Sequence, residues 1–255
     1  MSQQPYQIAS HSLANNQYLH VEWEAASQLF STAVYQLDSE SDGLSRRPVS
    51  AGRALVVEIE YQGQALLLKQ YTRGGLIRRF SRDSYFWTGM QRTRAAREVN
   101  LLASLYASGL PVPKPVGCRV ERLPGRYRAY LVTALIADCE SLDKVFFSHA
   151  ASQAASTATS TSLWEATGLC LARFRHAGVY HADLNLTNIL LDQSGQIYLL
   201  DFDRCYQTDP DGRRYAGLAQ RMLSRLLHSV NKFETKSGIP VSRLEREALT
   251  AAFWS

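Results

Sequence analysis

The sequence lacks any long apolar run. No stretch of its 255 residues reaches the 18 or so apolar residues that a membrane-spanning helix needs. The first 20 residues have neither the basic part nor the apolar part of a secretory signal. We therefore expect a protein that does not cross a membrane, although it can still bind at the surface of one.

Cysteine is scarce, and its four residues lie far apart, at Cys118, Cys139, Cys170 and Cys205. None belongs to a Cys-x-x-Cys pair, which argues against a zinc knuckle. This use of cysteine predicts reduced thiols in a cytosolic protein.

Charge alone does not choose a class of partner. The net charge is +5 and the pI is near 9.1, which weakly favours an anionic partner such as a nucleotide, a phospholipid or a nucleic acid. Mildly basic proteins are common, however. The 45% hydrophobic and 20% charged residues are typical of a globular protein. The length suits one domain or two small lobes.

Strand patterns gather in the first half of the chain and helix patterns in the second. Residues 53–71 read as a hairpin around Gly63, and residues 127–136 read as a buried strand. Helical periodicity recurs in three segments, residues 93–109, 163–178 and 213–254, the last broken near 236–240.

This distribution predicts an α+β fold with two lobes. We place a strand-rich N-terminal lobe at residues 1–136 and a helical C-terminal lobe at residues 137–255. The segment 148–162 contains only small and polar residues. It therefore predicts a flexible connector or a frayed helix.

The segment YHADLNLTNILLD (180–192) places polar side chains in an otherwise apolar stretch. Asp183 and Asn188 are five residues apart, and Asp201 ends a strand after a turn at 192–196. A hairpin of this length is expected to bring Asp201 close to the other two. Acids and a carboxamide supply the hard oxygen ligands that Mg²⁺ uses together with phosphates. The acid that does not bind the metal can then contact a substrate hydroxyl.

The pattern His-x-Asp-x-x-x-x-Asn followed by Asp-Phe-x is typical of the protein-kinase-like catalytic loop. It occurs here as His181, Asp183 and Asn188, followed by Asp201, Phe202 and Asp203. The alternative is a structural hairpin with helix caps and turn acids. The combined spacing favours the kinase interpretation, in a protein-kinase-like fold with a reduced C-terminal lobe.

Such a fold needs an upstream phosphate clamp. Lys69 lies at the end of a predicted strand, and Glu98 lies on the helix that follows, where it can pair with Lys69. A solvated helix acid beside Arg97 is the alternative for Glu98. A full Gly-x-Gly-x-x-Gly loop is absent, and only Gly52 lies at a suitable distance before Lys69. Backbone amides there can still bind phosphate.

The region after Asp201 is short for a protein kinase. It has 54 residues and no Ala-Pro-Glu motif, and Asp203 stands where protein kinases have glycine. We therefore expect a small-molecule or lipid-linked acceptor rather than a peptide.

Five tracts carry a more specific resemblance, YTRGGLIRRFSRDSYFWTGMQRTRAAREVNLL, GLPVPKPVG, GRYRAYLVTALI, HADLNLTNILLD and LLDFDRC. Together they resemble the 3-deoxy-D-manno-octulosonic acid (Kdo) kinase family over residues 50–230. The resemblance implies ATP-dependent phosphorylation of the 4-hydroxyl of Kdo on a lipid A precursor. It also implies a peripheral position at the cytoplasmic side of the bacterial inner membrane, with no nucleic-acid partner.

The resemblance and the motifs together assign roles to five residues. Asp183 is expected to orient and deprotonate the sugar hydroxyl. Asn188 and Asp201 are expected to hold Mg²⁺, which neutralises charge on the transferring phosphate. Lys69, held by Glu98, is expected to clamp the phosphates of ATP.

Two further residues of the loop have less specific roles. His181 is expected to support the loop by hydrogen bonding rather than to act as a base. Asp203 either assists the metal or pairs with Arg204. The segment 69–97 combines eight basic side chains with interleaved aromatics. It is either a solvated face or a contact with an anionic membrane.

Other classes share parts of this pattern. An aminoglycoside- or choline-type kinase uses the same catalytic set, but its cationic acceptor favours an acidic pocket over the basic segment 71–97. A pseudokinase scaffold is expected to lack Lys69, Asp183 or Asp201, and all three are present. A protein kinase is disfavoured by the short C-terminal region.

Overall fold

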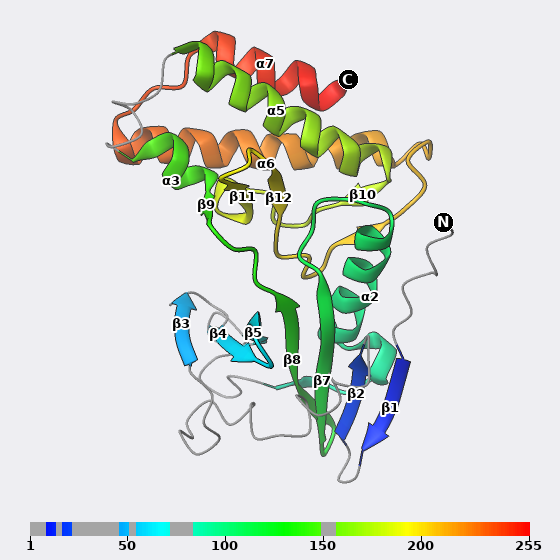
Figure 1. Ribbon diagram of the computed structural model, residues 1–255. Coiled ribbons are helices and arrows are strands. Elements are labelled where there is room, and N and C mark those ends of the chain that lie inside the picture. Colours follow the sequence, from blue (N-terminus) through cyan, green and yellow to red (C-terminus); the bar gives the residue numbers. More distant parts are fainter. Residues whose placement is uncertain (1–8, 14–16, 22–45, 51–54, 72–83, 149–156) are drawn as a thin grey trace, which may run out of the picture. The chain divides into compact units, whose positions relative to one another are not determined.

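The computed structural model describes residues 9–13, 17–21, 46–50, 55–71, 84–148 and 157–255 (Figure 1). The chain forms two compact units. The first comprises Met1–Gly109 and Pro113–Leu135, and the second comprises Leu110–Val112 and Ile136–Ser255. Gly52 lies outside the described residues, as do residues 72–83 of the basic segment and residues 149–156 of the low-complexity segment.

The first unit is built on an antiparallel sheet of eight strands. Seven of them lie in the order β1 (Ala9–Leu13), β2 (Gln17–Val21), β7 (Pro115–Leu123), β8 (Arg126–Ala134), β5 (Gln64–Gln70), β4 (Leu55–Tyr61) and β3 (Arg46–Ser50). The short strand β6 (Tyr85–Phe86) also pairs with β8. The predicted buried strand at 127–136 is confirmed as β8, which lies in the middle of this sheet.

The β4–β5 hairpin is confirmed with the predicted turn. Tyr61 pairs with Gln64, so the loop consists of Gln62 and Gly63 alone. Both have positive φ angles, 51° and 73°. A two-residue turn of this kind matches the twist of the flanking strands, and glycine adopts it without strain. The turn places Lys69 near the far end of β5.

The helix α2 (Arg94–Ala107) follows a 3₁₀ turn, η3 (Met90–Arg92), and confirms the predicted helix at 93–109. The side chain of Thr93 caps it by accepting from the amide of Ala96 at 3.3 Å. Gly109 follows it with a φ of 72°, which stops the helix. Its apolar stripe, which includes Val99 and Leu102, packs on β7 and β8.

The second unit is mainly helical. Its helices are α3 (Leu142–Phe147), α5 (Thr157–His176), α6 (Tyr215–Ser237) and α7 (Arg243–Trp254). The last two confirm the predicted helix pair with its break near 236–240. Residues 157–162, predicted as part of a connector or frayed helix, belong to α5.

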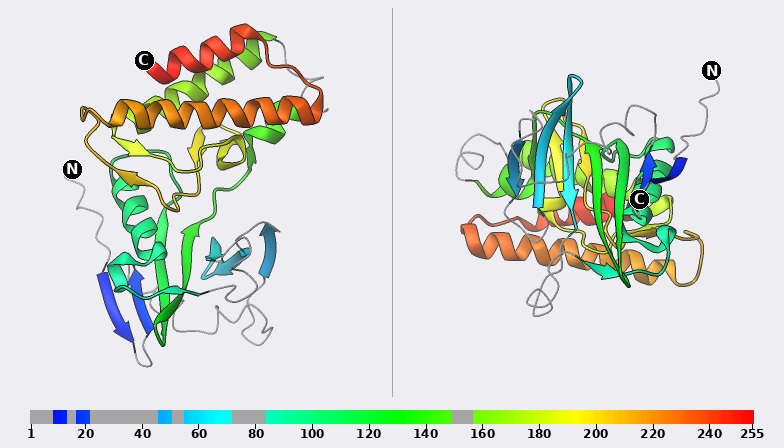
Figure 2. Two further views of the ribbon diagram at one scale, coloured as in Figure 1. Left: turned by 180° about the vertical axis from the view of Figure 1, so that it is seen from behind. Right: turned by 90° about the horizontal axis from the view of Figure 1, so that it is seen from below.

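Helices α5 and α7 lie side by side (Figures 1 and 2). Gly168 on α5 permits this close approach. A Cβ atom there would lie 2.5 Å from the carbonyl oxygen of Leu249 and 2.6 Å from the Cβ of Ala252. Glycine at this position therefore sets the distance between the two helices.

Short strands complete the second unit and position its polar loop. One sheet contains β9 (Cys139–Ser141), β11 (Ile189–Asp192) and β12 (Ile197–Leu199), and a second pairs β10 (Val179–Tyr180) with β13 (Tyr206–Gln207). The β11–β12 hairpin lies where a strand, a turn and a second strand were predicted. Among the described residues, no helix is long and apolar enough to cross a bilayer.

Candidate active site

The predicted clamp pair is present in the first unit. Lys69 Nζ donates to Glu98 Oε1 at 3.1 Å and to Oε2 at 3.3 Å. Glu98 is 4% exposed, so it is not the solvated helix acid of the alternative interpretation. Its position on the apolar stripe of α2 places it against the sheet. The ammonium of Lys69 is thus held by a buried carboxylate.

Tyr71 is a third member of this cluster, and the sequence interpretation missed it. Its hydroxyl donates to Glu98 Oε2 at 2.5 Å, and its side chain is buried. Burial, together with the neighbouring Glu98 carboxylate, holds the pKa of Tyr71 well above its usual value. Tyr71 therefore stays a neutral donor. Tyr71 is one of the interleaved aromatics of the segment 69–97, and its burial makes it a core residue of that segment.

The catalytic-loop residues lie in the second unit. Asp183 is exposed, and its backbone carbonyl accepts from Asn188 Nδ2 at 2.9 Å and from Asn185 Nδ2 at 2.9 Å. Asn185 also caps the 3₁₀ turn η4 (Leu186–Asn188), because its Oδ1 accepts from the amide of Thr187 at 2.9 Å. Two carboxamides thus fix the backbone at Asp183, while its carboxylate faces outward.

The β11–β12 hairpin brings the residue before Asp201 alongside Asn188. The amide of Leu200 donates to the carbonyl oxygen of Asn188 at 2.8 Å, and Asp201 follows immediately. Asp201 has a φ of 61°, a left-handed conformation that is uncommon for a residue other than glycine. Such strained backbone concentrates at functional sites.

His181 supports the loop, as the sequence predicts. It is fully buried, and its Nε2 donates to the carbonyl oxygen of Leu200 at 2.9 Å. Its ring also meets Phe202 edge-on, with 5.1 Å between centroids. His181 therefore connects the segment that carries Asp183 to the segment that carries Asp201.

Two sulfur atoms also hold this loop, and neither was predicted. The amide of Ala182 donates to Cys205 Sγ at 3.2 Å, and the amide of His181 donates to Met222 Sδ at 3.4 Å. Cys205 is one of four free cysteines, all of which the structure describes. Its thiol donates in turn to the carbonyl oxygen of Asp201 at 3.8 Å, a weak contact.

Helix α6 supplies a second support. The hydroxyl of Ser229 accepts from the buried amide of Leu186 at 3.2 Å, and Arg225 Nη1 donates to the carbonyl oxygen of Ala182. These contacts span 43 residues of sequence in both cases. No local sequence motif indicates these contacts, so they could not be predicted from the sequence.

The donor set near Asp183 fits a magnesium ion bound together with phosphates. The described residues contain no cluster of three or more His, Cys, Asp or Glu side chains able to hold a metal by themselves. Because Asn188 Nδ2 is used in the loop, its Oδ1 is the atom free to ligate. One carboxamide oxygen and the exposed Asp201 carboxylate suit Mg²⁺, which commonly takes its other ligands from substrate and water.

Comparison with known proteins places this site in a family. The model of the lipopolysaccharide kinase (Kdo/WaaP) family matches residues 50–253. A 3-deoxy-D-manno-octulosonic acid kinase of Xylella fastidiosa strain 9a5c is 36% identical over 207 residues, covering 80% of this chain and 77% of that protein. The enzyme of the same name from Xanthomonas axonopodis pv. citri strain 306 is 38% identical over 194 residues, covering 76% and 73%.

A solved structure agrees on the fold. The structure described as WaaP in complex with acyl carrier protein matches with a TM-score of 0.62 at 16% identity, covering 92% of this chain and 88% of that one. This likeness confirms the predicted protein-kinase-like fold. The family model and the sequence relatives show that the chain belongs to the lipopolysaccharide kinase (Kdo/WaaP) family.

Proposed function

We propose that this chain transfers the γ-phosphate of ATP to the 4-hydroxyl of a Kdo residue on a lipid A precursor. The observation that carries the proposal is the supported loop of the second unit, in which the backbone around an exposed Asp183 is held by Asn185 and Asn188. The acceptor is proposed from the relatives, which are named as Kdo kinases.

In the proposed reaction, Asp183 accepts the proton of the sugar hydroxyl. The hydroxyl oxygen forms a bond to the γ-phosphorus, the bond from that phosphorus to the bridging oxygen of ATP breaks, and ADP leaves. Asp183 suits this role because its carboxylate is exposed while its backbone is fixed. A positioned acid–base group of this kind contributes about 10²- to 10⁴-fold to the rate.

The nucleotide-binding roles follow from the charges present. Lys69, held by Glu98, presents one ammonium to the phosphates of ATP. Asn188 and Asp201 would hold Mg²⁺, which supplies positive charge to the transferring phosphate. The preformed Lys69–Glu98 pair means that the ammonium needs little reorientation on binding.

An acceptor panel tests this proposal. ATP consumption is measured with Kdo-linked lipid A precursor, with an aminoglycoside, with a generic protein and without an acceptor. We expect turnover with the Kdo-linked acceptor alone, because the relatives named as Kdo kinases match most of the chain. Turnover with the aminoglycoside instead would identify the other small-molecule class, and turnover with none of them would contradict the proposed activity.

We also propose that the chain works at the anionic cytoplasmic surface of the inner membrane, where a lipid-linked acceptor resides. Phe86 is 69% exposed, and the guanidinium of Arg126 lies 5.9 Å from its ring centre. Beside it, Arg122 lies 5.3 Å from the ring of Trp87. Phe86 is the exposed ring of this pair and Trp87 is partly exposed, and aromatic rings next to arginine suit the interface of an anionic bilayer.

Vesicle sedimentation tests the membrane proposal. We expect binding to anionic vesicles at low salt and release at high salt, because each basic residue contributes about 1 kcal/mol near such a surface. Phe86→Ser combined with Arg126→Glu should weaken binding. Arg213→Glu, a matched charge change at an exposed position of the second unit, should weaken it less. If both variants weaken vesicle binding equally, net charge explains the binding and no local contact is needed.

A further inference from the structure

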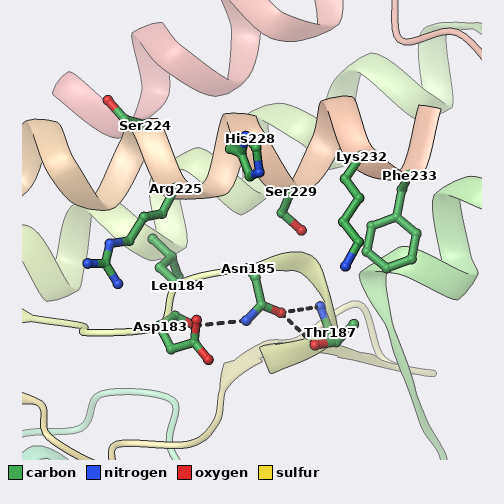
Figure 3. A pocket seen from close by; sticks show the side chains of 10 residues that line it. All are labelled: Asp183, Leu184, Asn185, Thr187, Ser224, Arg225, His228, Ser229, Lys232 and Phe233. Carbon is green, nitrogen blue, oxygen red and sulfur yellow. Dashed lines mark hydrogen bonds between the residues drawn. The ribbon is translucent and has the colours of Figure 1, made fainter. Parts of the chain in front are cut away.

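A pocket of about 530 Å³ lies beside Asp183, within the second unit (Figure 3). One wall is the loop that carries Asp183 and Asn185, and the other is helix α6. Its volume falls in the usual range for small-molecule sites, roughly 300–1,000 Å³. Because Asp183 itself lines the pocket, a molecule bound there lies next to the proposed catalytic carboxylate.

The α6 wall is basic. Arg225, His228 and Lys232 all line the pocket, and their spacing of three and then four residues puts them on one face of the helix. Figure 3 shows the side chains of Arg225 and Lys232 extending from α6 toward the loop. In the described part of the chain, neither Arg225 nor Lys232 forms an ion pair with a carboxylate.

The remaining walls are suited to a sugar. Phe233 offers an aromatic face, and its ring is itself held by stacking on Phe147 at 5.9 Å between centroids. Thr187, on the opposite wall, adds a hydroxyl group. An aromatic ring beside hydroxyl and cationic groups matches a polyhydroxylated ring that carries an acid.

We infer that this pocket is the acceptor subsite and that Arg225, His228 and Lys232 recognise the carboxylate of the acceptor sugar. The inference rests on the proposed function and deepens it. We place the anion on the same sugar as the reacting hydroxyl, because Asp183 and the basic residues of α6 line one pocket. A phosphate further along the lipid headgroup is the competing source of negative charge.

Lys232→Gln is the main test, because Lys232 makes no hydrogen bond with the described residues and its loss should not disturb the fold. We expect the KM for the Kdo-linked acceptor to rise about ten- to hundredfold, the usual value of a charge-assisted contact. The KM for ATP should stay within about twofold. Arg221→Gln is the matched control, since Arg221 is an exposed cation of α6 that does not line the pocket.

Arg225→Lys keeps the positive charge but removes the paired hydrogen bonds that a guanidinium can make to a carboxylate. Arginine binds a carboxylate through two parallel hydrogen bonds, and lysine offers only one point charge. We expect a rise in acceptor KM smaller than that of Lys232→Gln, with a conserved melting temperature. An unchanged acceptor KM in both variants would overturn the inference, even if the wild-type protein phosphorylates the acceptor.

Direct binding keeps this inference separate from the proposed function. Calorimetric titration of the wild-type protein with free Kdo, with its C1 amide and with Kdo-free lipid A precursor needs no turnover. We expect free Kdo to bind, its amide to bind more weakly, and Lys232→Gln to weaken free Kdo. Equal binding of the acid and the amide, or loss of lipid A precursor binding alone in Lys232→Gln, would reject the carboxylate assignment. If the wild-type protein binds free Kdo but does not phosphorylate the Kdo-linked acceptor, the result counts against the proposed function instead.

Discussion

The clamp of the first unit and the loop of the second unit hold their charged groups in opposite ways. In the clamp, the buried carboxylate of Glu98 is satisfied by Lys69 and Tyr71. In the loop, the Asp183 carboxylate is exposed and forms no hydrogen bond with the described residues, whereas the backbone beneath it is held by Asn185 and Asn188.

This difference predicts that the two clusters contribute differently to folding stability and to catalysis. A buried ion pair is costly to break, because removing one partner leaves an uncompensated charge. An exposed carboxylate with a fixed backbone contributes little to folding and is available to substrate. Changes in the clamp should therefore lower both stability and activity, whereas changes to the Asp183 side chain should lower activity alone.

The largest expected effect is on the rate. Asp183→Asn should lower kcat by about 10²- to 10⁴-fold, because the amide cannot accept the proton of the hydroxyl. Its free energy of unfolding should change by less than about 0.5 kcal/mol, as for most surface substitutions. Steady-state kinetics and urea denaturation check both. A variant with near wild-type turnover would remove Asp183 from its proposed role.

Lys69→Met should lower the free energy of unfolding by about 3 kcal/mol, because it leaves the Glu98 carboxylate buried without its cation. Phosphate transfer should be lost as well. The double variant Lys69→Met with Glu98→Gln removes the buried charge and should regain most of the stability without regaining activity. If the double variant is as unstable as the single one, the ion pair is not the source of the loss.

Tyr71→Phe should cost about 1.5–3 kcal/mol, the value of a hydrogen bond to a charged group. The raised pKa of Tyr71 also predicts how the stability changes at high pH. Above about pH 10 the unfolded chain releases this proton while the folded chain keeps it, so the stabilising contribution is lost as pH rises. Urea denaturation across about pH 8 to 11 should show a steeper fall for wild type than for the variant; parallel curves would contradict this.

The smallest expected effect is in the support of the loop. Ser229→Ala removes the acceptor of the buried Leu186 amide and should cost about 1–2 kcal/mol. Turnover should fall as well, since the loop loses one of its supports. Thr235→Ala is the control, because Thr235 is exposed on the same helix, bonds only within it and does not line the pocket. Similar losses in both would mean that the helix itself is perturbed.

Local sequence patterns predicted the helices and strands, and the Lys69–Glu98 pair that two of them carry. The apolar runs around Gly63 specify the hairpin, and the stripe of α2 specifies which face meets the sheet. Lys69 and Glu98 could be paired because a strand and the next helix carry them in a known pattern. The roles of Asp183, Asn188 and Asp201 remain predictions, as does that of Gly52, which lies outside the described residues.

Contacts that span long stretches of chain could not be predicted in this way. Tyr71 reads as an ordinary aromatic at a strand end until Glu98 is placed beside it, 27 residues on. Cys205 reads as one scattered thiol, yet it accepts from the amide of Ala182. The basic stripe of α6 reads as a solvated helix face until the fold places it across a pocket from Asp183.

The most direct test of this account is the position of the phosphate in the product. ATP and Kdo-linked lipid A precursor are incubated with wild-type protein and with Asp183→Asn, and the product is analysed by mass spectrometry and phosphorus–proton correlation NMR. We expect one added phosphate on the 4-hydroxyl of Kdo with wild type and almost none with the variant. Phosphate on the lipid A sugars, or an unmodified acceptor despite ATP consumption, would contradict it.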